Sequence, residues 1–313
     1  MPLKTIKNDT AQALTLEWVL HVKNYKLTID KNHCAGCQIC SLACPKEAIK
    51  LEKQPKLQDE TKKKAKVDVD LAKCNFCGIC DVLCPYGAIK VTVNGQHLLN
   101  VVEKESFPTL IRDIQVDATK YPSATARGGE LCPLNLINVT WFAPDGKTVE
   151  NMKSLKKKGR EELKAQIDVD KGACPCCRVC ESTLPEGVMR VQKFLYGRIA
   201  INQAKCPEGC TDCMDVCPIT GALYLSLEDD KVHEDETFCV YCGACKLVCP
   251  VEDALELKRT KIMHTPVRSG AWNKALERLA SPVEMTKELK AKGSMKVKES
   301  VEKRLAWRMH QNG

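Results

Sequence analysis

Four similar cysteine-rich stretches constrain the fold of this chain more than any other feature. CAGCQICSLACP begins at Cys34, CNFCGICDVLCP at Cys74, CPEGCTDCMDVCP at Cys206 and CVYCGACKLVCP at Cys239. Each stretch has three closely spaced cysteines and a fourth that precedes a proline, and the stretch at Cys206 has one extra residue in its first gap. Short alternating or apolar runs flank them, which is typical of short strands. The pattern predicts repeated copies of one small unit.

The spacing of these cysteines indicates iron–sulfur ligation. C-x2-C-x2-C-x3-C-P is the pattern of bacterial-type ferredoxins, in which three thiolates hold one [4Fe–4S] cluster and the fourth ligates the cluster of the paired stretch. Zinc, the less favoured alternative, is usually bound by separated cysteine pairs, and disulfides belong to oxidising compartments. Small residues between the ligands, such as Gly36 and Gly78, let backbone N–H groups turn toward the cluster.

Exchange of the fourth ligand between paired stretches predicts four complete sets. The first pair of stretches supplies Cys34, Cys37, Cys40 and Cys84 for one cluster, and Cys74, Cys77, Cys80 and Cys44 for its neighbour. The second pair supplies Cys206, Cys210, Cys213 and Cys249, and then Cys239, Cys242, Cys245 and Cys217. Of the 21 cysteines, these sets leave Cys132, Cys174, Cys176, Cys177 and Cys180.

A fifth stretch, CPCCRVCESTLP at residues 174–185, is an incomplete copy of the repeat. Its Cys174, Cys177 and Cys180 fall on the triplet, but Leu184 occupies the place of the fourth cysteine. The stretch therefore has three of the ligands for its own cluster and gives none to a partner.

The missing ligand is predicted to come from upstream, where ELCP places Cys132 before a proline. The triplet positions that belong to this upstream half are Pro122, Thr125 and Gly128. One cluster of the pair thus has no ligands and the other has four, which indicates a module that has lost one whole cluster. Alternatively, Cys132 is a buried thiol, and Cys176 or another group completes the set. The preferred interpretation gives five [4Fe–4S] clusters and leaves Cys176 without a role.

The charge and composition favour a soluble iron–sulfur protein over a nucleic-acid-binding protein. The formal net charge is +8, but five oxidised clusters with their thiolates would contribute roughly −10. Aromatic residues make up only 5% of the chain, so few side chains could stack on bases. No apolar signal region, membrane-spanning run or nucleotide-binding glycine loop is evident, and we expect a cytoplasmic protein.

These observations predict an α+β fold made of tandem bacterial-type dicluster ferredoxin modules, with short β-hairpins and short helices around the clusters. The predicted segments are an N-terminal extension at 1–28, module 1 at 29–106, a one-cluster module 2 at 107–200, module 3 at 201–260 and a helical docking tail at 261–313. The N-terminal stretch LTLEWVLHVKNYKLTI is predicted as a strand pair or a further docking segment.

Two other kinds of segment bear on partners. The polar runs at 54–66 and 153–164 are predicted as solvated faces, with docking to acidic partners as the alternative. In the tail, Ser281 begins a capping box for a helix that should end near Gly293. Val297, Val301 and Leu305 give a second helix a narrow apolar stripe. We expect the tail to dock on another subunit rather than on its own modules.

Three stretches resemble the polyferredoxin F subunit of archaeal tungsten or molybdenum formylmethanofuran dehydrogenase: CDVLCPYGAIKVTVNG, VVEKESFPTLIRDIQVD and HTPVRSGAWNKALERL. The resemblance extends along most of the chain. It implies a non-catalytic subunit that carries low-potential electrons to a pterin-bound metal centre on other subunits, where CO2 is reduced in methanogenesis, and that bridges copies of the complex. Family members can have more ferredoxin repeats than this chain.

The residues by themselves leave other functions open. Several clusters in one chain form an electron conduit, because each transfer step is short although the whole path is long. Such a conduit could equally belong to a hydrogenase or a heterodisulfide reductase complex. An enzyme with its substrate at a cluster that has an open iron site is an alternative of another class, as is a protein whose clusters are structural.

Overall fold

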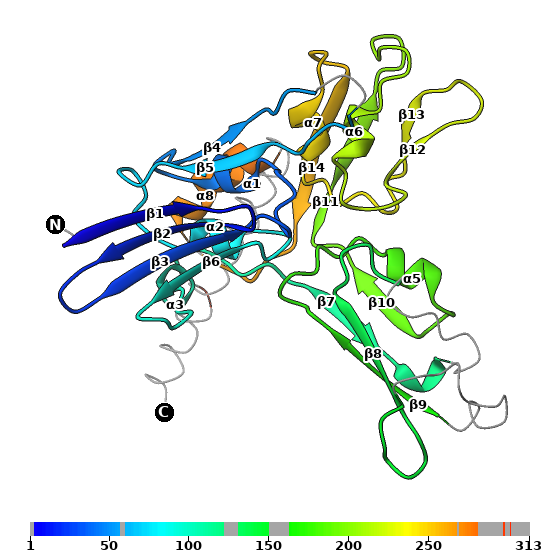
Figure 1. Cartoon of the computed structure of the whole chain (residues 1–313), viewed down its shortest axis with the longest axis horizontal. Helices are drawn as coiled ribbons and strands as arrows, with labels where there is room; N and C mark the ends of the chain where they lie inside the picture. The colour runs from blue at the N-terminus through cyan, green and yellow to red at the C-terminus, as the bar shows by residue number, and fades with distance from the viewer. Residues whose placement is uncertain are drawn as a thin grey trace.

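The structure is a computed structural model that describes residues 3–56, 60–121, 131–149, 163–267 and 269–280, together with the single residues 297 and 301. Its described part forms three lobes that meet near the centre of the molecule (Figure 1). Module 1 lies at the left of this view, module 2 at the lower right and module 3 at the upper right. None of the helices in these ranges is long and apolar enough to cross a membrane.

Module 1 is built on a four-stranded antiparallel sheet in the order β1-β2-β3-β6. The expected N-terminal strand pair is confirmed, since β2 pairs with β3 from Ala13–Asp30 to Val19–Asn24. β3 then pairs with β6, so the extension continues the ferredoxin sheet across the predicted boundary at residues 28 and 29. The elements of this module are β1 (Lys4–Asp9), β2 (Ala13–Val19), β3 (Asn24–Asp30), α1 (Ile39–Ala43), β4 (Ile49–Glu52), β5 (Lys66–Val69), α2 (Ile79–Val82), β6 (Ile89–Val93) and α3 (Asn100–Glu103).

The three modules share one antiparallel strand pairing. In each, the strand that enters the first half pairs with the strand that leaves the second half, and the two middle strands pair with each other. The pairs are β3–β6 and β4–β5 in module 1, β7–β10 and β8–β9 in module 2, and β11–β14 and β12–β13 in module 3. The predicted α+β ferredoxin fold is therefore confirmed, and module 2 keeps its topology although its first half lacks the cysteine triplet.

Modules 2 and 3 consist of similarly short elements. Those of module 2 are β7 (Asp113–Val116), a 3-10 turn η1 (Ala118–Lys120), β8 (Ile137–Phe142), β9 (Lys164–Val169), α5 (Val179–Thr183) and β10 (Met189–Gln192). Those of module 3 are β11 (Leu195–Ile201), α6 (Asp212–Asp215), β12 (Leu223–Leu225), β13 (Val232–Glu234), α7 (Ala244–Val248) and β14 (Leu255–Ile262). Helices of four or five residues have little stability of their own, so they depend on packing against the cysteine loops and strands.

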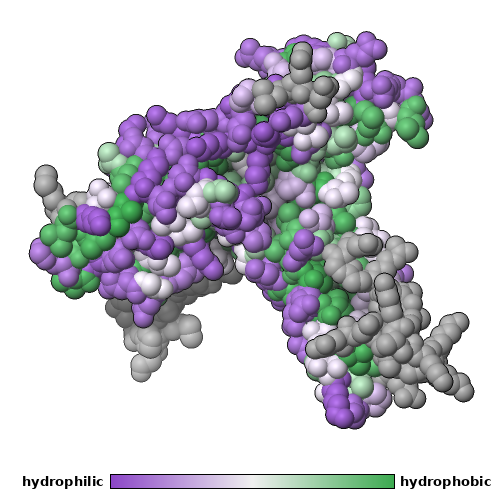
Figure 2. Space-filling view, in the orientation of Figure 1, coloured by the Kyte–Doolittle hydropathy of each residue, from purple (hydrophilic) through white to green (hydrophobic). Residues whose placement is uncertain are grey.

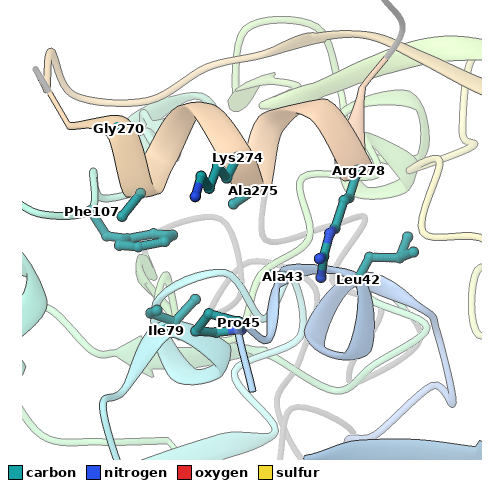
Figure 3. A pocket seen from close by; sticks show the side chains of 10 residues that line it. Leu42, Ala43, Pro45, Ile79, Phe107, Gly270, Lys274, Ala275 and Arg278 are labelled. Atoms are coloured by element: carbon teal, nitrogen blue, oxygen red, sulfur yellow. The ribbon is translucent and has the colours of Figure 1, made fainter. Parts of the chain in front are cut away.

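The segment that follows β14 returns to module 1 and ends in α8 (Gly270–Leu279). Trp272 on α8 has no exposed surface and packs edge-on against Phe107 and His264, with ring centroids 6.0 and 4.9 Å away. α8 lies across α1 and borders a groove that also includes Leu42 and Ile79 (Figure 3). α8 thereby fastens the end of module 3 to module 1.

The described part of the tail packs on module 1 of its own chain, whereas the sequence favoured docking on another subunit. The apolar side chains of α8, including Ala275, Leu276 and Leu279, are buried within the chain itself. The helix predicted to begin at Ser281, and Leu305 of the second predicted helix, lie outside the described residues.

The polar run at 54–66 contacts an acidic helix of the same chain. Lys56 Nζ lies 2.8 Å from Asp212 Oδ1, and the backbone N–H of Lys62 donates to Asp215 Oδ2 at 2.9 Å. Figure 2 shows the band of hydrophilic side chains that follows β4 and β5 toward module 3. The acidic partner considered for this run is therefore supplied, at least in part, by α6 of module 3. The other polar run lies almost entirely outside the described residues.

Replacing Trp272 with alanine should release α8 from module 1. Loss of a fully buried tryptophan costs about 3–5 kcal/mol, which is comparable to the stability of a local unit of structure. Hydrogen-exchange mass spectrometry should show faster exchange of the α8 amides, whereas the exposed neighbour Lys274→Ala should leave them protected. Unchanged exchange in the tryptophan variant would contradict this account of the packing.

Candidate iron–sulfur centres

The same left-handed turn occurs in all five cysteine triplets. The residue immediately before the second cysteine has a positive φ angle in each: Gly36 (+66°), Phe76 (+53°), Cys176 (+57°), Gly209 (+66°) and Tyr241 (+50°). Only glycine adopts this conformation without strain, so the non-glycine residues are held there by the surrounding loop. Cys176, to which the sequence assigned no role, therefore occupies the left-handed position of the turn that all five triplets of this chain share.

The turn directs backbone N–H groups at the cysteine sulfurs. The N–H of Tyr241 donates to Cys239 Sγ at 3.4 Å. Burial raises the pKa of Cys34 and Cys74, and the corresponding N–H groups of Gly36 and Phe76 act against that rise. The N–H of Cys176 likewise acts to lower the pKa of Cys174. Hydrogen bonds of this kind favour the thiolate over the thiol. The predicted inward turn of the backbone is thus present, with the cysteine sulfurs as its acceptors.

The structure brings together the predicted set of Cys74, Cys77, Cys80 and Cys44. Burial raises the pKa of Cys80 well above its usual value, and the neighbouring thiols of Cys77, Cys74 and Cys44 raise it further. Cys74 and Cys77 come from the loop before α2, Cys80 lies within α2, and Cys44 comes from the end of α1. The fourth sulfur therefore reaches this site from the other half of module 1.

The second predicted set of module 1 lies beside the first. Burial raises the pKa of Cys40 well above its usual value. The thiol of Cys80, in the adjacent set, raises it further, as do the thiols of Cys84 and Cys34 in the same set. Burial also raises the pKa of Cys37 well above its usual value, and neighbouring thiols, which include those of Cys40 and Cys84, raise it further. The two thiol groups of the module are thus close enough to interact electrostatically.

Module 3 repeats this arrangement. Burial raises the pKa of Cys213 to about 12, and the neighbouring thiols of Cys210, Cys206 and Cys249 contribute to this rise. The other predicted set lines a single cavity with apolar residues, and its members are Cys217, Cys239, Cys242 and Cys245. Each predicted set of module 3 is therefore assembled from both halves of the module.

In module 2 the structure brings Cys132 to the incomplete triplet. Cys132, Cys174, Cys177 and Cys180 line one cavity that is otherwise largely apolar. Burial raises the pKa of Cys177 to about 11 and that of Cys180 to about 12, with Cys132 among the thiols that add to both shifts. The three positions of the upstream half that lack cysteine, 122, 125 and 128, lie outside the described residues.

Two other residues of the incomplete stretch, Leu184 and Cys176, are buried but do not line this cavity. Leu184, at the place of the missing cysteine, is only 6% exposed and belongs to the apolar core. Cys176 is fully buried and does not line the cavity of its neighbours. Its thiol lowers the pKa of Cys174 to about 7, although burial acts in the opposite direction. The Cys176 thiol therefore acts on Cys174 as a hydrogen-bond donor.

The donor chemistry of these sites fits [4Fe–4S] clusters. Within the described ranges, no group of three or more His, Cys, Asp or Glu side chains is arranged to hold a single metal ion. The thiols instead surround cavities, with apolar walls and backbone N–H donors around them. When bound to such thiolates, a [4Fe–4S] cluster accepts and releases electrons. The chain contributes the four sulfur ligands, the N–H donors and the exclusion of water.

Two arginines connect ligand loops of different modules or elements. Arg112 donates through Nε to the Cys174 carbonyl at 3.0 Å, and through a terminal nitrogen to the Cys84 carbonyl at 2.9 Å. The buried Arg259 donates to the carbonyls of Tyr241 and Cys242, both at 2.8 Å, and to that of Leu279 on α8. Sequence reasoning did not identify either arginine, because neither lies in a recognisable motif.

Module 1 also contacts the ligand loop of module 3 directly. After burial, the Cys242 thiol is the largest influence that raises the pKa of Cys37. Tyr86, which follows the Cys84-Pro85 pair, lines the cavity of the Cys242 set. Burial, followed by the thiols of Cys242 and Cys37, raises the pKa of the Tyr86 phenol well above its usual value, so the phenol keeps its proton.

Comparison with known proteins supports the iron–sulfur interpretation. Residues 23–88 and 198–257 each match a family described as a 4Fe-4S dicluster domain. The polyferredoxin-like subunit of the aliphatic sulfonate oxidoreductase of Pyrococcus furiosus is 33% identical over 102 residues, a match that covers 29% of this chain and 56% of that protein. The chain thus spans little more than half the length of this relative.

A solved structure resembles nearly the whole chain. It is a chain of the formate dehydrogenase–heterodisulfide reductase–formylmethanofuran dehydrogenase complex from Methanospirillum hungatei, with a TM-score of 0.74 and 28% sequence identity. The likeness covers 90% of this chain and 92% of that one. Together with the two dicluster domains, it supports an archaeal-type polyferredoxin with [4Fe–4S] clusters in modules 1 and 3.

Replacing Cys132 with serine should remove one cluster. The iron content of the purified protein should fall from about 20 to about 16 atoms per chain, because each cluster contains four. Cys176→Ser is the matched control, since this thiol is buried beside the same stretch without lining the cavity, and it should retain the full iron content. Equal iron contents in wild type and Cys132→Ser would contradict the assignment of Cys132 as a ligand.

Cluster assembly on the apoprotein should become more complete as the pH rises. The ligand is the thiolate, and burial raises the pKa of thiols such as Cys180 and Cys213 to about 12. Below these values, a higher pH increases the thiolate fraction and favours metal binding. Iron and sulfide incorporation, followed by visible absorbance from about pH 7 to about pH 9, should increase across this range; a flat profile would contradict the expectation.

Proposed function

We propose that this polyferredoxin carries low-potential electrons to the catalytic subunits of a formylmethanofuran dehydrogenase complex. The observation that carries the proposal is the continuity of thiol-lined sites through all three modules. The Cys37 thiol of module 1 interacts with Cys242 of module 3, and Arg112 joins the carbonyl of Cys84 in module 1 to that of Cys174 in module 2. Electrons can therefore cross the chain in short steps.

We further propose five clusters, with the fifth in module 2. Its support is the cavity lined by Cys132, Cys174, Cys177 and Cys180, and the module topology that matches those of modules 1 and 3. This cluster would extend the path into module 2. The site of Cys34, Cys37, Cys40 and Cys84 would then lie between the sites of the other two modules.

The outer end of module 3 is the proposed place of electron exchange with a partner. Cys206 and Cys210 of its outer set are half-buried rather than enclosed. They precede α6, which packs against β12, and the loop between β12 and β13 exposes Leu227 completely. A half-exposed ligand set beside an exposed apolar side chain suits transient contact with another redox protein.

The identity of the complex rests on two supports. The sequence resembles the F subunit of formylmethanofuran dehydrogenases, and the similar solved chain belongs to a complex whose name includes that enzyme. The name of the same complex also includes heterodisulfide reductase, which makes a polyferredoxin of that enzyme the second candidate. In either case the substrate is converted on another subunit.

An electron-transfer assay distinguishes these two partners. The chain, loaded with clusters and photochemically reduced, is mixed with catalytic subunits of formylmethanofuran dehydrogenase that lack their own polyferredoxin, together with methanofuran and CO2. Formylmethanofuran should form only when the reduced chain is present. The matched reaction contains heterodisulfide reductase and its disulfide substrate in place of these components.

The outcomes are separable. Formation of formylmethanofuran with slow or absent disulfide reduction supports the proposal. Rapid disulfide reduction without formylmethanofuran would instead identify the second candidate. Failure of the reduced chain to pass electrons to either enzyme would contradict both.

A further inference from the structure

Tyr86 is inserted from module 1 into a thiol-lined cavity of module 3. It follows the last cysteine of its own stretch by two residues, and its side chain is only 2% exposed. It lines the cavity that contains Cys217, Cys239, Cys242 and Cys245. An aromatic residue of one module thereby closes the predicted cluster site of another.

The hydroxyl group of Tyr86 is an unpaired donor in this cavity. Of the buried side-chain polar atoms that the structure describes, Tyr86 Oη is one of the few without a hydrogen-bond partner of normal geometry. Cys242 lines the same cavity as Tyr86. A buried tyrosine hydroxyl usually finds a partner, so this unpaired group points to an acceptor that belongs to the site.

The same residue lies beside the neighbouring site in the sequence. Tyr86 follows Cys84, a member of the predicted set of module 1, by two residues, while its side chain lines the cavity of a predicted set of module 3. One residue thus connects the two predicted sets. The residues after the Cys-Pro or Leu-Pro pair of the other stretches are Lys46, Glu186, Ile219 and Val251. Among the five stretches, only this one places a phenol there.

We propose that the Tyr86 hydroxyl donates a hydrogen bond to the cluster held by Cys217, Cys239, Cys242 and Cys245, and thereby raises its reduction potential. Reduction adds negative charge to a cluster, so a donor to its sulfur atoms stabilises the reduced form more than the oxidised form. Tyr86 would then set the potential of this site relative to the adjacent site of module 1. The inference rests on the proposed ligand set but does not depend on which complex the chain serves.

Removal of the hydroxyl alone tests the inference. In Tyr86→Phe the ring remains in place while the donor is lost, and the full-length protein is studied with its clusters bound. In an EPR-monitored redox titration with chemical mediators, one component should become harder to reduce. We expect its equilibrium constant for reduction to fall by three- to tenfold, which is a decrease of up to about 59 mV for a one-electron couple.

Three comparisons make the result specific. Tyr224→Phe, at a tyrosine of module 3 that is 47% exposed, should leave every component unchanged. Cys217→Ser should alter or remove the component that shifts in Tyr86→Phe, which identifies the cluster concerned. Iron analysis should give the same content for Tyr86→Phe and for wild type.

Several outcomes would overturn the inference. Unchanged potentials in Tyr86→Phe would show that the hydroxyl does not act on a cluster. A shift in a component that Cys217→Ser leaves intact would place the effect at another site. Loss of iron in Tyr86→Phe would assign the residue to cluster retention rather than to tuning. Since no partner enzyme is present in the titration, failure of the proposed complex would leave these results unaffected.

Discussion

Exchange of the fourth sulfur ligand between paired halves is the constraint on which this fold depends. A cysteine before a proline, such as Cys44, lies at the end of one short helix but faces the thiols of the other half. Each half needs the other to complete its site, and the two crossed strand pairs of every module hold the halves in register. The helices and hairpins are too short to be stable alone.

Module 2 shows how far this architecture tolerates the loss of ligands. Its strands keep the same crossed pairing, and Leu184 places apolar volume where a sulfur would stand. Cys132 nevertheless reaches the cavity of the other half. The strand pairing therefore keeps the four cysteines of the proposed fifth site together, although the paired site has no cysteines.

The grouping of the cysteines could be predicted from the sequence because it depends on local spacing and on one rule of exchange. Even Cys132 could be placed, since the positions without ligands in the two halves of module 2 belong to the same site. The strand pair at the N-terminus was one of two predictions for that stretch, the other being a docking segment. Cys176 could not be interpreted, because a left-handed turn is recognisable when glycine occupies it but not when cysteine does.

Contacts between modules could not be predicted, because they join residues far apart in the sequence. In the sequence, Arg112 before β7 and Arg259 within β14 look like ordinary surface cations, because their carbonyl partners are not visible there. The polar run at 54–66 was predicted chiefly as a solvated face, and nothing in its sequence indicated that it contacts the acidic residues of α6. Tyr86 carried a weak signal, as an aromatic side chain where the other stretches have aliphatic or charged residues.

The position of Tyr86 makes the environment of one site depend on a neighbouring module. Its side chain belongs to module 1, yet it forms part of the wall of a cavity whose four cysteines all belong to module 3. Separation of the two modules would remove this part of the wall and admit water to the cavity. The solvent exposure of the site is therefore a property of the packing between modules and not of module 3 alone.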